Sequence, residues 1–145
     1  LSGLMEEWLA PLHRLNADGD PIEEIIDYVL RKLEMAQELP RESRLFANEI
    51  VQGAPRILGQ IEGELRALVD EKSAVIQTWL DQQKIAAFAP QHLIFSIWAT
   101  TQHYADFDVQ VRGILQPQGD EHFADAAAFL RDFYRRALTP VNLPG

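Results

Sequence analysis

The 145-residue sequence contains no cysteine, and this absence removes whole classes of protein. Without thiols there can be neither a disulfide framework nor a zinc site built from thiolates. No apolar run approaches the roughly 20 residues that a membrane-spanning helix needs, and no segment has the layout of a signal peptide. These absences predict a cytoplasmic protein that does not contact a membrane.

Catalytic signatures are also missing. The sequence holds no H-E-x-x-H, G-x-S-x-G, G-x-G-x-x-G or G-K-[ST] run, so metalloprotease, hydrolase and nucleotide-binding motifs are excluded. Di-iron helical bundles use Glu-x-x-His pairs, and none of the four histidines has a glutamate three positions before it. We therefore expect no enzymatic activity, no cofactor and no metal centre.

Basic residues are few. The chain has 22 acidic and 13 basic residues, for a net charge of −9. A surface of that sign repels phosphate, so this chain alone should not bind nucleic acid. The length fits one domain over residues 1–145. Because the chain begins at Leu1 and not at a methionine, we interpret it as part of a longer protein.

Helical periodicity dominates the sequence, while alternating strand-like patterns are nearly absent. Asp20 and Asp120 are suitable N-caps, Gly59 and Gly63 predict an irregular start to the fourth helix, and residues 139–145 should form a loose tail. The pattern predicts an all-α protein of about six helices, over residues 1–15, 21–40, 41–52, 55–84, 90–106 (continuing with a kink towards 115) and 121–138.

The fifth predicted helix has an unusual composition. Apart from histidines, residues 91–105 carry no charge, and the first acid is Asp106. Because a surface helix would show a charged face, we expect this helix to be buried nearly all round, by its own domain and by a partner. One sector of about 100° combines aromatic side chains with an amide and a carboxylate: Phe95, Trp98, Ala99, Gln102 and Asp106. Leu93, Ile97, Thr100 and Tyr104 lie opposite, as packing surface.

Apolar walls with a few convergent polar groups are typical of small-molecule pockets. Ordinary core packing with a hydrogen-bonded amide is, however, the commoner reason for aromatics and glutamine in a buried helix. The composition of the helix leaves both interpretations open.

Several segments together resemble one family. They are residues 8–12 (WLAPL), 43–46 (SRLF) with Glu49, 53–55 (GAP), 70–74 (DEKSA), 90–95 (PQHLIF), 97–99 (IWA) and 101–107 (TQHYADF). These runs are similar to the C-terminal region of TetR-family transcriptional repressors, of the pyrimidine-utilisation type.

The resemblance implies an all-α effector-binding domain that follows an N-terminal helix-turn-helix head. Residues 1–15 would then be the end of the helix that leaves the head, and DNA would be contacted only through that absent head. The resemblance also implies a homodimer, formed by the last two long helices of each chain as a four-helix bundle.

The family further implies a pocket that accepts uracil or thymine. By this resemblance, the residues that line the family's pocket correspond to Trp8, Trp98 and Gln102 in this sequence, with Phe46, Glu49, Phe95 and Asp106 as further candidates. A flat pyrimidine can stack on an indole, and a glutamine amide offers one donor and one acceptor to the imide edge. Backbone or water groups must complete the set.

Two alternatives stay open. The third helix departs from the family pattern at Ala47 and Asn48, which is compatible with another planar or amphiphilic effector in the same kind of domain. The second alternative is a helical interaction module without a ligand.

Overall fold

The computed structural model describes residues 2–141, with side chains from Met5 onward. Within that range no strand occurs, and the predicted all-α class is confirmed. Leu1 and residues 142–145 of the predicted tail lie outside the described residues. The helices are α1 (Ser2–His13), α2 (Pro21–Glu38), α3 (Pro40–Val51), α4 (Leu58–Gln60), the π-helical turn η1 (Ile61–Leu65), α5 (Arg66–Asp81), α6 (Pro90–Asp106), α7 (Asp108–Leu115) and α8 (His122–Leu138).

The two predicted aspartate caps have different outcomes. Asp20 caps α2 as expected, since its carboxylate accepts the backbone N–H of Glu23 at 3.0 Å. The prediction for Asp120 is wrong: α8 begins at His122 and its N-cap position makes no side-chain hydrogen bond. A stronger partner takes the Asp120 carboxylate, because the Arg112 guanidinium binds it at 2.6 Å, and a charge-assisted bond outcompetes a neutral backbone N–H.

The predicted helix over residues 55–84 is shorter and interrupted. The chain forms the short α4 and then the π-helical turn η1 before regular α-helix starts at Arg66. Gly63 lies inside the turn and Gly59 just before it, where glycine weakens α-helix by about 1 kcal/mol relative to alanine. The irregular start is therefore confirmed, while α5 ends at Asp81 and does not reach residue 84.

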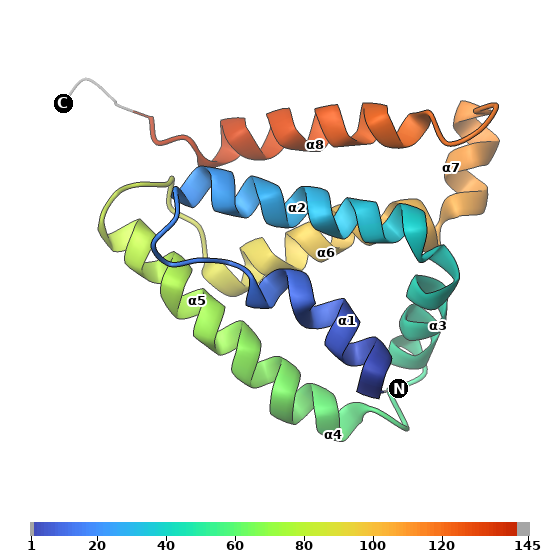
Figure 1. The fold of residues 1–145 in the computed structure, drawn as a ribbon, viewed down its shortest axis with the longest axis horizontal. Helices are drawn as coiled ribbons and strands as arrows, with labels where there is room; N and C mark the ends of the chain where they lie inside the picture. The colour runs from blue at the N-terminus through green and yellow to red at the C-terminus, as the bar shows by residue number, and fades with distance from the viewer. Residues whose placement is uncertain (1, 142–145) are drawn as a thin grey trace.

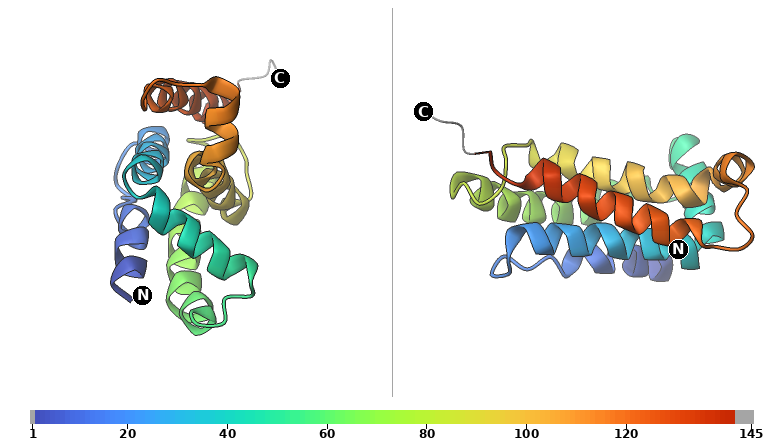
Figure 2. Two further views of the ribbon diagram at one scale, coloured as in Figure 1. Left: turned by 90° about the vertical axis from the view of Figure 1, so that its right-hand side faces the viewer. Right: turned by 90° about the horizontal axis from the view of Figure 1, so that it is seen from above.

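Helix α2 lies at the centre of the molecule and contacts α1, α3, α6 and α8 (Figure 1). Helix α8 runs along one edge, and α1 and α5 lie towards the opposite edge (Figure 2). The predicted kink after α6 is a sharp turn at Phe107, from which α7 leads across to α8. Among the described residues, no helix is long and apolar enough to cross a membrane.

The chain by itself covers only one side of α6. Ile94, Ile97 and Thr101 are at most 1% exposed, which makes them the centre of the buried side. On the other side Phe95 is 47% exposed and Phe107 is 56% exposed. The part of α6 around Phe95 is thus left without cover by the rest of the described chain.

Candidate functional site

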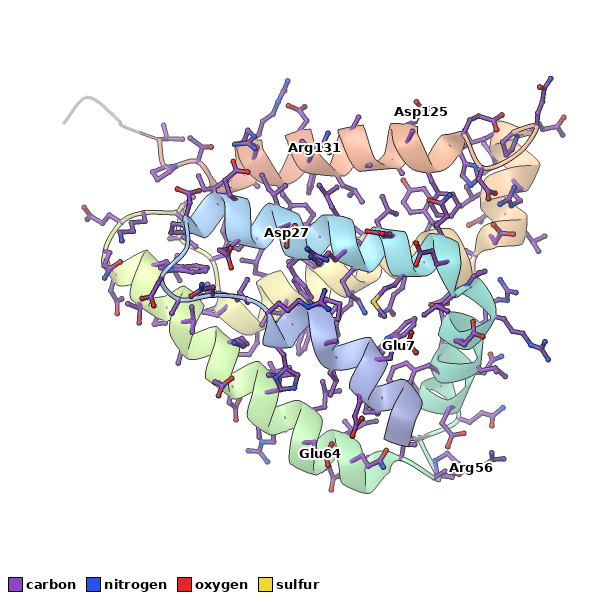
Figure 3. The ribbon with its side chains drawn as sticks, viewed as in Figure 1. Glu7, Asp27, Arg56, Glu64, Asp125 and Arg131 are labelled. Atoms are coloured by element: carbon purple, nitrogen blue, oxygen red, sulfur yellow. The ribbon has the colours of Figure 1, made fainter. Side chains whose placement is uncertain are left out.

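A small enclosed cavity of about 50 Å³ lies where α1, α2, α3, the turn η1 and α6 meet. Residues that are far apart in the sequence form its wall: Met5, Trp8, Leu9, Tyr28, Lys32, Phe46, Leu65, Trp98 and Gln102. Charged side chains such as Arg56, after α3, and Glu64, in η1, lie at the rim of the molecule (Figure 3). The wall of the cavity is mainly apolar and aromatic, and its polar side chains are Tyr28, Lys32 and Gln102.

Two of its aromatic walls are held in place by contacts with the protein. The Trp98 indole N–H donates to the Tyr28 hydroxyl at 2.7 Å, and the Trp8 and Phe46 ring centroids are 6.2 Å apart. Burial raises the pKa of Tyr28 above its ordinary value, so the phenol remains protonated. A tyrosine hydroxyl that accepts one hydrogen bond can still donate another.

The indole N–H of Trp8, in contrast, has no hydrogen-bond acceptor among the described residues. The Trp8 ring is 6% exposed, and its Nε1 is buried. A buried donor without a partner costs about 1–3 kcal/mol. An acceptor inside the cavity would remove that cost, so the indole N–H of Trp8 is a candidate ligand contact.

Sequence reasoning missed Lys32, which is 2% exposed and lines the cavity. Its Nζ lies 4.4 Å from the centroid of a Trp8 ring, a cation–π distance. Burial lowers the pKa of Lys32 to about 7, and the charge of Asp106 opposes that effect in part. The signal was present in the sequence: Lys32 follows Tyr28 by four positions and Val29 by three, on the apolar stripe of α2, where a charge is out of place.

The structure brings together four of the seven residues predicted for the pocket: Trp8, Phe46, Trp98 and Gln102 all line the cavity. The other three lie outside its wall. The Glu49 carboxylate accepts the backbone N–H of Arg56 at 2.9 Å, and the Asp106 carboxylate accepts the Ser43 hydroxyl at 2.6 Å. Phe95 packs on Trp98 with ring centroids 5.6 Å apart.

The comparison with known families identifies the helical fold. The family described as "YcdC-like protein, C-terminal region" matches residues 1–141. This chain therefore belongs to that family, the C-terminal region of TetR-type transcriptional regulators.

Individual relatives agree with the family. Over 114 residues the chain is 46% identical to the "HTH-type transcriptional regulator RutR" of Escherichia coli (strain K12) and to the protein of the same name from Shigella flexneri. The aligned segment is 79% of this chain and 54% of each relative, so the chain spans about half the length of the curated relatives it matches. These relatives are regulators and not enzymes.

Proposed function

We propose that the chain is a single effector-sensing and dimerisation domain of a cytoplasmic transcriptional repressor, with uracil or thymine as its effector. DNA would be bound by a helix-turn-helix head outside this sequence, as the name of the relatives suggests for them. The observation that carries the proposal is the enclosed cavity with Trp8, Trp98 and Gln102 in its wall.

A pyrimidine suits this wall chemically. Stacking of a base on an aromatic side chain contributes about 1–3 kcal/mol. The Gln102 amide offers one donor and one acceptor, and the free N–H of Trp8 offers a further donor. One ring with two carbonyl oxygens and an N–H between them can use all three groups.

The cavity must enlarge to admit such a ring. Its volume of about 50 Å³ is well below the roughly 300–1,000 Å³ of established ligand pockets. Helix α3 is the wall best placed to move, since Ser43 is its one fully buried residue. The turn η1, which carries Leu65, is a second, because π-helical turns occur frequently at functional sites.

Helix α1 connects the cavity to the proposed head. It contributes Met5, Trp8 and Leu9 to the wall and contacts α2 and α5. A dimer that reads two half-sites needs its recognition helices about 34 Å apart. A ligand-dependent shift of α1 would change that spacing, and a coupling of about 1–3 kcal/mol changes occupancy 5–150-fold.

Exposed apolar side chains support the proposed homodimer. Phe129 and Phe133 on α8 are 60% and 49% exposed, and Val109 and Ile114 on α7 are 88% and 75% exposed. Together with Phe95 on α6 they leave apolar surface on the helices expected to form a four-helix bundle. Sedimentation should show a dimer for the wild-type chain and a monomer for Phe133→Glu, because a buried unpaired charge opposes association.

Thermal unfolding of the chain with and without uracil tests the effector. Ligand at 100 times its dissociation constant adds about 2.7 kcal/mol of stability, and Trp98→Ala should abolish the shift. An absent shift with both uracil and thymine contradicts the pyrimidine assignment. If a wider ligand screen also produces no shift, the chain is an interaction module.

In a gel-shift experiment this chain alone should not retard DNA.

A further inference from the structure

Lys32 has a buried ammonium group without a countercharge in contact with it. In the part of the chain that the structure describes, no hydrogen bond contributes to the electrostatics of Lys32, which is set by burial and by the charge of Asp106. Its Nζ lies 4.4 Å from the centroid of a Trp8 ring. The carboxylate of Asp106, whose charge favours the protonated form of Lys32, already accepts a hydrogen bond from the Ser43 hydroxyl at 2.6 Å. Buried charges are otherwise paired or bound to a ligand, so the donor capacity of Lys32 is available to the cavity.

We propose that Lys32 is a specificity-determining residue, which donates a hydrogen bond to a carbonyl oxygen of a planar ligand. The inference rests on the proposed function and names the ligand class more closely. Three other polar groups belong to the wall: the unpaired Trp8 indole N–H, the Tyr28 hydroxyl and the Gln102 amide. Donors exceed acceptors in this set when Lys32 is protonated, because an ammonium group and an indole N–H only donate.

A donor-rich wall favours a ring with two carbonyl oxygens, such as an imide, over a ring in which an amino group replaces one carbonyl. In the second case the amino N–H groups would face the donors of Lys32 or Trp8, and buried donors would stay unpaired. The wall therefore predicts that uracil is bound and cytosine is rejected, because cytosine has an amino group in place of one carbonyl oxygen and a lone pair in place of the neighbouring ring N–H. A site that hydrogen-bonds a ligand group can reject an analogue without it by factors of about 10⁴.

Ligand binding should also be coupled to a proton. Around Lys32, α1 contributes Trp8, α3 contributes Phe46, η1 contributes Leu65, and α6 contributes Gln102 and the more distant Asp106. On α2 itself, burial raises the pKa of Tyr28 further above its ordinary value, so this phenol does not titrate near pH 7. Because burial lowers the pKa of free Lys32 to about 7, the amine takes up a proton when an acceptor oxygen binds above that pH.

The test is calorimetry of uracil and cytosine binding to the 145-residue chain at about pH 6, 7 and 8, in buffers of different ionisation enthalpy. In the wild-type chain uracil affinity should be flat below about pH 7 and fall up to about tenfold over the next unit. Lys32→Met should weaken uracil binding at least about tenfold at pH 6, remove the pH dependence and reduce the preference over cytosine. Lys84→Met, an exposed lysine outside the cavity wall, is the matched control and should behave as wild type.

The outcomes separate the two proposals. If wild type binds no uracil at any pH, the pyrimidine function itself is wrong. If wild type binds uracil with a pH-independent affinity, or if Lys32→Met binds it equally well, the role of Lys32 is overturned and the function stands. Thermal unfolding of Lys32→Met checks its folding, and the pH profile of the wild-type chain tests the proposal without any variant.

Discussion

Two tryptophans of similar burial contrast the cavity with the closed part of the core. Trp79 on α5 is 2% exposed, and its indole N–H donates to the Ala17 carbonyl at 3.3 Å. Trp8 on α1 is 6% exposed, and its N–H has no partner among the described residues. The two rings are therefore similarly buried and differ in the hydrogen-bonding state of the indole N–H.

The same contrast extends to the neighbours of each ring. Trp79 belongs to the apolar core, which contains fully buried aliphatic side chains such as Leu12 and Ile25. Around Trp8 the wall includes a lysine, an amide and a phenol beside a cavity. We expect substitutions in the first region to change stability, and substitutions in the second region to change ligand binding.

The largest expected effect is that of Trp79→Ala. Truncation of a buried tryptophan lowers the free energy of unfolding by about 3–5 kcal/mol, measurable by urea denaturation.

A sharper comparison of the two tryptophans replaces each of them with phenylalanine. Trp79→Phe loses a hydrogen bond and Trp8→Phe loses none, so Trp79→Phe should be the less stable by about 1 kcal/mol. Equal losses at the two positions would contradict the contrast.

The second effect is the pH dependence of stability that arises from Lys32. Burial lowers the pKa of Lys32 in the folded chain to about 7, from 10.5. Below about pH 7 both states bind the proton and the cost of burying the charge is fully present. Above it the folded state releases the proton first, so stability rises with pH by up to about 1.4 kcal/mol per unit. Urea denaturation between pH 6.5 and 8.5 should show that Lys32→Met is more stable than wild type. The difference between their free energies of unfolding should decrease as pH rises. A difference that does not change with pH would contradict the lowered pKa of Lys32.

Tyr28→Phe should have the third largest effect. The Trp98 indole N–H donates to the Tyr28 hydroxyl, so this substitution leaves the N–H without an acceptor. The free energy of unfolding should fall by about 1–2 kcal/mol. Tyr134→Phe is the matched control in the closed region. Its partners Ser96 and Thr100 keep bonds to the Leu93 and Ser96 carbonyls, so this change should cost less in chemical denaturation. The reverse order would show that the Tyr28 contact contributes little.

The smallest expected change in stability is that of Gln102→Leu. Gln102 is only half-buried, so stability should change by less than about 0.5 kcal/mol. Uracil affinity should nevertheless fall at least tenfold, about 1.4 kcal/mol, in calorimetry. A large loss of stability with unchanged affinity would place Gln102 with the structural residues.

Local sequence was sufficient for most of the secondary structure and for part of the candidate site. Helical periodicity and the Asp20 cap located α2 to within two residues at its end, and the glycines predicted the irregular start of α5. The motifs around Trp8, Phe46, Trp98 and Gln102 identified the family and four residues of the wall. These signals are local, because they depend on side chains that share one helix face or one short segment.

Only the tertiary structure decided which polar groups are free. Glu49, Asp106 and Asp120 have partners on other segments or helices, and no spacing within one helix reveals them. Lys32 lies on the apolar stripe of α2, and only the packing of α1 and α6 against α2 places it in the wall of the cavity. A hydrogen bond between helices depends on how they pack, which is why the sequence by itself determined the helices and the family, and the fold determined the chemistry of the cavity.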